Sequence, residues 1–314
     1  MPLKIGFAGA GYISGVHKNN LVLDDRVEIV STFDPDPARG DTRSFDETLA
    51  RCDAVYITAP NTRHVELALR AVEAGKHVFC EKPMATTMAD AERVLAAAQS
   101  STRVFQVGHN RRFAKVYQAV KRLLADAPPH AAHLKMNRGE LLKPFWTADE
   151  SVTGGFLFET PIHMFDMMRF QFGEIASLDA RAGRVNDFSM LVEFATGMYA
   201  TFVTSADASW FFPYERMEVY GAYSTIETAE MESLSYRIGL DAETATEDFR
   251  ALPLEEKLGF REEDRLFVDA VLSGGAPPVT ALDGYRSVEL ACACYRSVAE
   301  RRRIDLGRVV GGGL

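Results

Sequence analysis

A carboxylate and an ammonium group follow one another at the end of a short apolar run in the stretch His77–Pro83, HVFCEKP. Residues 78–80 are typical of a buried strand, so Glu81 and Lys82 come at its end. The carboxyl ends of the strands of an open parallel sheet face the ligand crevice. A lysine there places a positive charge at a reaction site, and Pro83 restricts the turn that follows. A solvated Glu-Lys pair is the alternative, but the sequence upstream favours the functional interpretation.

That upstream sequence contains a glycine motif, Gly9-Ala10-Gly11-Tyr12-Ile13-Ser14, directly after the apolar residues 4–8. The first glycine allows a tight turn, and the second lets a pyrophosphate approach the backbone at a helix N-terminus. Serine replaces the usual third glycine or alanine and is still small enough for the helix to pack on the strand. Strand, motif and helix in this order predict a dinucleotide site that includes Gly9, Gly11, Tyr12 and Ile13.

An acidic residue, Asp34, ends the next predicted strand, residues 27–33. It lies roughly 20 residues beyond the glycine motif, where a carboxylate binds the ribose hydroxyls of NAD. The following Pro35 offers no positive charge for a 2′-phosphate. An aspartate before proline is also common in turns, and the two interpretations are compatible. We therefore predict NAD as the cofactor in preference to NADP.

Strands and helices alternate through the first part of the chain. This order is typical of a doubly wound parallel sheet, and it predicts a Rossmann domain over residues 1–120. Gly75 is a candidate C-cap between a helix and the HVFCEKP strand. The expected strands are 4–8, 27–33, 53–59, 78–80 and 104–107, and the expected helices extend to about residue 23 and over 60–74, 86–100 and 114–125.

The pattern changes after Pro128-Pro129. Strands joined by short turns then predict an antiparallel meander, and two amphipathic helices end the chain. A separate strand candidate, 131–137, comes first, and the strands of the meander are 178–185, 188–194, 198–206, 215–220 and 224–230. The helices are 160–172, which precedes the meander, and 262–272 and 284–301, which follow it. The sequence thus predicts an α/β protein whose second domain, residues 121–314, is an α+β domain with a large, mostly antiparallel open-faced sheet. The last helices are candidates to pack back on the first domain.

The composition excludes several classes of protein. The chain has 314 residues, enough for two domains, and its 47% apolar and 25% charged residues are typical of a globular protein. A net charge of −9 disfavours nucleic-acid and anionic-membrane partners. The four cysteines have no metal-ligand spacing, so we expect no metal and a reducing compartment. We find no signal peptide and no apolar run of membrane-span length, and we expect a cytoplasmic protein.

In order and spacing, the motifs resemble those of the Gfo/Idh/MocA oxidoreductases. The likeness covers nearly the whole chain and rests on GAGYIS with Asp34, PNTRH, AGKHVFCEKP, GHNRRF, Gly154-Gly155 with Glu159, His163 and Asp166, and the terminal GYRSVELACACYRSVAERRRIDL. Members of this family join an N-terminal Rossmann domain to a C-terminal domain with a large open-faced sheet.

The resemblance implies roles for particular residues. Lys82 of EKP would be catalytic, and His163 would accept or donate the proton. The residues placed near the cofactor are Asn61, His64, Glu81, Lys82 and Arg111. Other interpretations stay open: Asn61 is suited to cap a helix, and His163 could be an ordinary histidine of an amphipathic helix. Arg112 could be solvated, and Trp146 could form a pocket wall or close the domain junction.

The chemistry of alcohol oxidation agrees with these roles. Histidine can accept the hydroxyl proton near neutral pH, and an adjacent ammonium stabilises the developing alkoxide. The cofactor supplies the redox chemistry. Glu159 occupies the position at which the family usually has aspartate, so its carboxylate is one methylene longer. We include Glu159 with Lys82 and His163 as catalytic, because it could orient the imidazole or the substrate; the substrate class stays open.

We therefore predict an NAD(P)-dependent oxidoreductase that transfers a hydride between the nicotinamide and a hydroxyl or keto carbon of a sugar, cyclitol or related polyhydroxylated compound. We also expect a homodimer or homotetramer formed through the second sheet. One alternative is a glycosidase of the same fold that retains NAD, which bulk reduction of NAD would distinguish. The other is a non-catalytic, dinucleotide-responsive regulator, and an intact Lys82–His163 pair argues against it.

Overall fold

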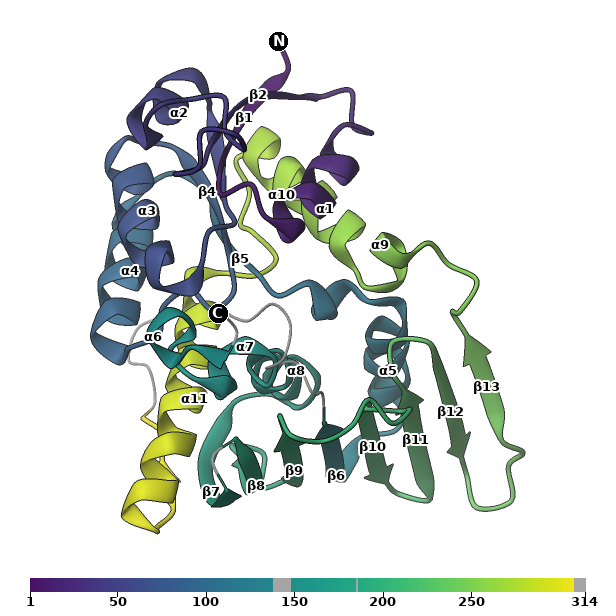
Figure 1. The fold of residues 1–314 in the computed structure, drawn as a ribbon. Coiled ribbons are helices and arrows are strands. Elements are labelled where there is room, and N and C mark those ends of the chain that lie inside the picture. Colours follow the sequence, from purple (N-terminus) through teal and green to yellow (C-terminus); the bar gives the residue numbers. More distant parts are fainter. Residues whose placement is uncertain (138–147, 185, 308–314) are drawn as a thin grey trace.

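The computed structural model describes residues 1–137, 148–184 and 186–307, which form two sheets (Figure 1). The first sheet is parallel and has the strand order β2-β1-β3-β4-β5. It comprises β1 (Leu3–Ala8), β2 (Val27–Phe33), β3 (Ala54–Ile57), β4 (His77–Glu81) and β5 (Phe105–Gly108). The predicted doubly wound sheet is confirmed. The strand order reverses at β1, so the carboxyl ends of β1 and β3 mark the ligand crevice.

Helices connect these strands: α1 (Tyr12–Leu21), α2 (Phe45–Arg51), α3 (Asn61–Glu73) and α4 (Met88–Ser100). All four residues of β3 are fully buried, as expected for a parallel strand covered on both faces. The helix α2 was not predicted from the sequence. Its start is nevertheless marked, because the Ser44 side chain accepts a hydrogen bond from the backbone of Glu47.

The second sheet has nine strands in the order β13-β12-β11-β10-β6-β9-β8-β7-β14. All neighbours are antiparallel except β6 and β9, so the mostly antiparallel sheet is confirmed. The strands are β6 (Pro129–Met136), β7 (Ile175–Arg184), β8 (Asp187–Phe194), β9 (Tyr199–Ser205), β10 (Glu215–Gly221), β11 (Ser224–Ala229), β12 (Ser233–Ile238), β13 (Ala245–Asp248) and β14 (Ile304–Asp305). The prediction of an uninterrupted meander was wrong, because β6 lies between β9 and β10.

One face of this sheet packs on helices. α5 (Lys115–Asp126), α8 (Ile162–Phe172) and α11 (Ala281–Glu300) lie on the side toward the first sheet, and no described helix covers the other side (Figure 1). β8 follows this arrangement in its sequence. Met190 and Val192 are buried, whereas Leu191 between them is 48% exposed.

The last long helices pack against elements of the first sheet's layer. α10 (Phe260–Ser273) packs on α1, and α11 packs on α4 (Figure 1). Phe267 of α10 stacks edge-on against Tyr56 and Phe79 of the parallel sheet. The predicted division at 120/121 lies inside α5 and stays a prediction. The remaining helices are short: η1 (Asn110–Phe113), α6 (Glu150–Thr153), α7 (Phe156–Glu159) and α9 (Leu254–Lys257).

Candidate active site

The glycine motif forms an open turn between β1 and α1. Gly9 has φ +104°, and a Cβ there would lie 2.6 Å from the carbonyl oxygen of Thr58, so only glycine fits. At Gly11, the N-cap of α1, a Cβ would meet nothing within 4 Å, and no side chain caps the helix. In the described part of the chain, no side chain therefore occupies the backbone N–H groups at this helix start. This geometry fits the pyrophosphate of a dinucleotide.

Asp34 lies beside this turn. One of its carboxylate oxygens accepts a hydrogen bond from the backbone of Ala10 at 2.9 Å, and the other accepts one from Asp36 at 2.9 Å. Ser14 is buried in α1, in agreement with the tight packing expected at the third motif position. Tyr12 is 82% exposed and Ile13 is half-buried at the helix start. The side chain at Asp34 thus adjoins the predicted phosphate-binding turn.

Lys82 connects the end of β4 to α7 of the second domain. Its ammonium donates a hydrogen bond to the backbone oxygen of Glu159 at 2.9 Å. The Glu159 carboxylate in turn accepts a hydrogen bond from the side chain of Asn61 at 2.6 Å. Asn61 also donates to the backbone oxygen of Thr153 at 3.1 Å, and it does not cap α3, which has Pro60 as its N-cap. We call Asn61, Lys82 and Glu159 the domain clasp.

His163 lies in the first turn of α8 and is 8% exposed, so it is not a surface histidine. Its ring contacts that of His109, with centroids 6.4 Å apart and an interplanar angle of 79°. One turn further along the helix, Asp166 forms a two-pronged ion pair with Arg112 at 2.6 and 2.8 Å. The helix turn that carries His163 is therefore fixed by a buried charge pair.

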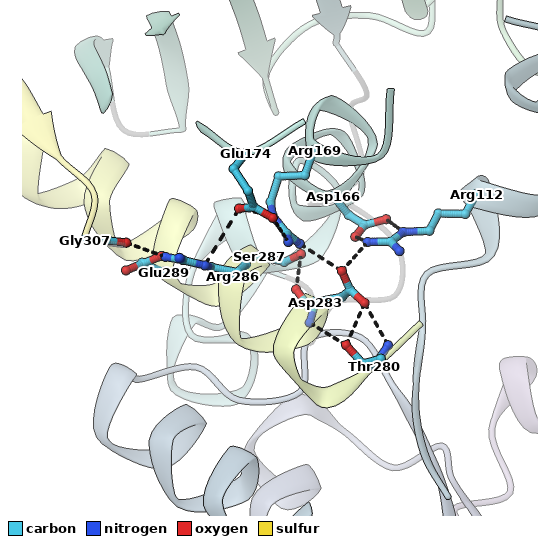
Figure 2. Close-up of polar contacts among 10 residues, drawn as sticks. All are labelled: Arg112, Asp166, Arg169, Glu174, Thr280, Asp283, Arg286, Ser287, Glu289 and Gly307. Carbon is cyan, nitrogen blue, oxygen red and sulfur yellow. Dashed lines mark hydrogen bonds and ion pairs between the residues drawn. The ribbon is translucent and has the colours of Figure 1, made fainter. Parts of the chain in front are cut away.

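Arg112 belongs to a larger network that ties η1, α8 and α11 together (Figure 2). The solvated interpretation of Arg112 was wrong: it also binds Asp283 at 2.9 Å, and Arg169 contacts the same carboxylate at 3.2 Å. Burial opposes the charge of Asp283, yet the two guanidinium groups hold the pKa of this carboxyl well below its usual range. Buried ion pairs such as these fix geometry more than they add stability.

Arg111 is directed toward the second sheet. It is buried and forms a two-pronged ion pair with Glu215 of β10 at 2.8 Å, and the Tyr117 hydroxyl donates to the same carboxylate at 2.6 Å. His64 is also engaged by the protein. Its two ring nitrogens lie 2.7 Å from the carbonyl oxygens of Pro83 and Ala59, and burial lowers its pKa. Through these contacts, His64 stabilises the turn that follows Lys82.

Glu81 is directed into the protein and belongs to a cluster that sequence reasoning missed. One of its oxygens lies 3.0 Å from His17, whose other ring nitrogen lies 2.7 Å from Asp264 of α10. Burial opposes protonation of His17, but the two carboxylates raise its pKa well above the usual value. Glu263, fully buried beside this cluster, has a pKa raised well above the usual range by burial and by the charge of Glu81. His17 lies on the expected first helix, but no sequence signal pairs it with α10.

The remaining expectations concern Trp146, a metal ion and membrane-spanning helices. Trp146 lies outside the described residues. Within residues 1–137, 148–184 and 186–307, no cluster of three or more histidine, cysteine, aspartate or glutamate side chains is arranged to hold a metal ion. In the same part of the chain, no helix is both long and apolar enough to cross a membrane.

The parallel sheet and its glycine turn form a dinucleotide-binding fold, and comparison with known proteins specifies the family. Residues 3–109 match the family model described as "Oxidoreductase family, NAD-binding Rossmann fold", and residues 128–306 match "Oxidoreductase family, C-terminal alpha/beta domain". The chain belongs to the Gfo/Idh/MocA oxidoreductase family. The predicted fold, the NAD cofactor and the function as an oxidoreductase are thereby confirmed, and neither alternative function is favoured.

Individual relatives match this chain over nearly its whole length. The inositol 2-dehydrogenase 1 of Saccharopolyspora erythraea is 30% identical and aligns over 98% of this chain and 97% of its own. The inositol 2-dehydrogenase of Rhizobium meliloti strain 1021 is 29% identical and aligns over 98% of this chain and 100% of its own. Among solved structures, levoglucosan dehydrogenase in complex with NADH superposes with a TM-score of 0.88 and covers 98% of this chain and 100% of its own. Its sequence is 18% identical, so the likeness shows the common fold.

Proposed function

We propose that this protein is an NAD-dependent dehydrogenase that oxidises a secondary hydroxyl of a cyclitol or a closely related polyol. The observation that carries the proposal is the domain clasp. Lys82, at the carboxyl edge of the parallel sheet, contacts the end of α7, and His163 follows in the next helix. The ammonium of one domain is thus held at Glu159, four residues before His163 of the other domain. The inositol dehydrogenases among the relatives support the substrate class.

The glycine turn and Asp34 are proposed to hold the cofactor. The N-terminus of α1, left uncapped at Gly11, binds the pyrophosphate through its N–H groups and its positive dipole end. Asp34 accepts hydrogen bonds from the adenosine ribose and repels a 2′-phosphate, which favours NAD over NADP. When bound, NAD supplies the hydride acceptor. Tyr12 and Ile13 flank the pyrophosphate at the start of the helix.

Lys82 and His163 are proposed to act on the reacting hydroxyl. An ammonium has three donors, and the Glu159 carbonyl uses one, so Lys82 can still donate to the substrate oxygen. This positive charge stabilises the oxygen as its proton leaves. His163 accepts that proton, a task for which imidazole is suited near neutral pH.

Glu159 and Asn61 act through Lys82. The Glu159 backbone fixes the ammonium, and its carboxylate is fixed by Asn61, so the longer glutamate side chain reaches across the junction to the first domain. We therefore assign Glu159 as a positioning residue of the clasp. Arg111, Glu81 and His64 support the cofactor site from inside the protein, because their described contacts are to other protein groups.

We further propose a homodimer or homotetramer that forms in the cytoplasm. The open face of the second sheet carries exposed apolar side chains, among them Leu191, Tyr199 and Tyr220. Pairing two such faces would remove these side chains from water. All four cysteines are free thiols, in agreement with a reducing compartment.

The test is a polyol screen that includes myo-inositol, with NAD in excess. We expect NADH to form in a one-to-one ratio with ketone product. In Lys82→Ala and His163→Ala, turnover should fall by about 100- to 10,000-fold with NADH affinity nearly unchanged, because each residue acts on the reacting hydroxyl. Parental turnover in His163→Ala would show that this histidine does not carry the proton. Sugar release without net NADH would instead show a glycosidase.

A further inference from the structure

His109 differs from the other deeply buried histidines. His17 and His64 are both within 1% of full burial, and each has both ring nitrogens within hydrogen-bond distance of a protein oxygen. His109 is equally buried at 1% exposure. Yet across the three described ranges of the chain neither of its ring nitrogens has a hydrogen-bond partner. Buried polar groups are nearly always paired, so this imidazole needs an explanation.

Its position places it at the reaction site. Glu81 of β4 pairs with Gly108 of β5, so Lys82 and His109 are the next residues of two adjoining parallel strands. Both therefore leave the sheet at its carboxyl edge, where neighbouring strands are about 4.8 Å apart. On its other side the His109 ring contacts His163, at a centroid distance of 6.4 Å. His109 thus lies next to both residues proposed to act on the hydroxyl.

The charged groups around His109 are already paired. They are Asp166, Arg112, Asp283 and Glu81, and each has a protein partner: Arg112 binds both aspartates, and Glu81 binds His17. Burial, the largest influence, lowers the pKa of His109. The ring is therefore neutral at pH 7, with one nitrogen that donates and one that accepts. The hydrogen-bond partner of the His109 ring must therefore be a group that can accept a hydrogen bond from one nitrogen or donate one to the other.

We propose that His109 is a further binding residue of the reaction site, whose neutral imidazole exchanges a hydrogen bond with a reactant group that both donates and accepts. The inference rests on the proposed function, because that reaction brings two such groups to His163: a secondary hydroxyl of the polyol and the carboxamide of the nicotinamide. A phenyl ring at this position would keep the ring contact with His163 and lose the hydrogen bond. An amide side chain would keep a donor and an acceptor.

The experiment compares the parent protein with His109→Phe, His109→Gln and the control His130→Gln, which changes an exposed histidine at the start of β6. Melting temperatures first show that each variant is folded. NADH affinity is then measured by fluorescence titration, and kcat and KM are measured with myo-inositol and NAD. We expect His109→Phe to lose about 10-fold in kcat/KM or in NADH affinity, the size of one hydrogen bond to a neutral group. His109→Gln should retain most of both, and the control should match the parent.

The pattern of loss identifies the bound group. A raised KM for myo-inositol with parental NADH affinity assigns the hydroxyl, and weaker NADH binding assigns the carboxamide. His109→Phe with parental kcat/KM and parental NADH affinity would overturn the proposal, and a water would then satisfy the ring. Equal losses in the Phe and Gln variants would also overturn it, because packing alone would explain them. If the parent reduces no NAD with any polyol, the proposed function fails, and the NADH titration alone decides the role of His109.

Discussion

The hydrogen bond between Asn61 and Glu159 gives the sharpest test of the domain clasp. The two atoms are 2.6 Å apart, and the acceptor is a carboxylate. Hydrogen bonds to charged groups contribute about 1.5–3 kcal/mol, whereas neutral ones contribute about 0.5–1.5 kcal/mol. We therefore expect Glu159→Ala and Asn61→Ala each to lower kcat/KM by roughly 10- to 150-fold. Glu159→Gln keeps an acceptor and loses only the charge, so its loss should be about 5-fold.

A double-mutant cycle separates the contact from the two individual residues. If the clasp works as a unit, the double variant Asn61→Ala/Glu159→Ala should be little worse than either single one, with a coupling of about 1.5–3 kcal/mol. Glu159→Asp, one methylene shorter, should behave like Glu159→Ala unless the chain shifts to restore the contact. Glu150→Ala, an exposed glutamate in the neighbouring α6, serves as the control. Losses that simply add, within about 0.5 kcal/mol, would refute the reasoning.

Three further predictions concern other parts of the molecule. Asp34→Ala combined with Pro35→Arg should narrow or reverse the preference for NAD over NADP in binding titrations; equal affinity of the parent for both would contradict the assignment. Analytical ultracentrifugation should show a dimer or tetramer that Leu191→Glu weakens, and a parent that stays monomeric at all concentrations would count against the sheet interface. Because the folded-state pKa of His17 is raised above 6.5, its charge stabilises the fold fully below that pH and the contribution is lost as the pH rises through the folded pKa. In urea unfolding, the free energy of unfolding of the parent should be lower at about pH 9 than at about pH 6, and this difference should be smaller in His17→Gln.

The sequence predicted those features that depend on local pattern. The apolar run before Glu81, the glycine turn and the alternation of strands and helices all reflect burial and backbone geometry within one segment. Short strands such as β13 were missed because only alternate residues are even half-buried, which leaves no apolar pattern. The direction of Glu81 could not be predicted either. It depends on His17 and on Asp264, which α10 brings from the far end of the chain.

The burial of Arg112 could not be predicted from the sequence either. As a residue in a run of polar side chains it gave no sign of burial, and its partners come from α8 and α11. His109 stood in a quoted motif and received no role, because a single histidine after a strand carries no signal until its neighbours are known. The unpaired ring becomes visible only when β5, α8 and the rest of the junction are assembled.

The return of α10 to the parallel sheet has a consequence for biosynthesis. Phe79 and Tyr56 leave the ribosome early, but Phe267, which covers them, is made near the end. At translation rates of about 5–20 residues per second, the interval is roughly 10–40 s. During this time the nucleotide-binding half carries an apolar face that water contacts and that chaperones or neighbouring chains can occupy. The apolar face of the cofactor domain is therefore covered only when translation has passed most of the second domain, and the synthesis of α10 determines when this can happen.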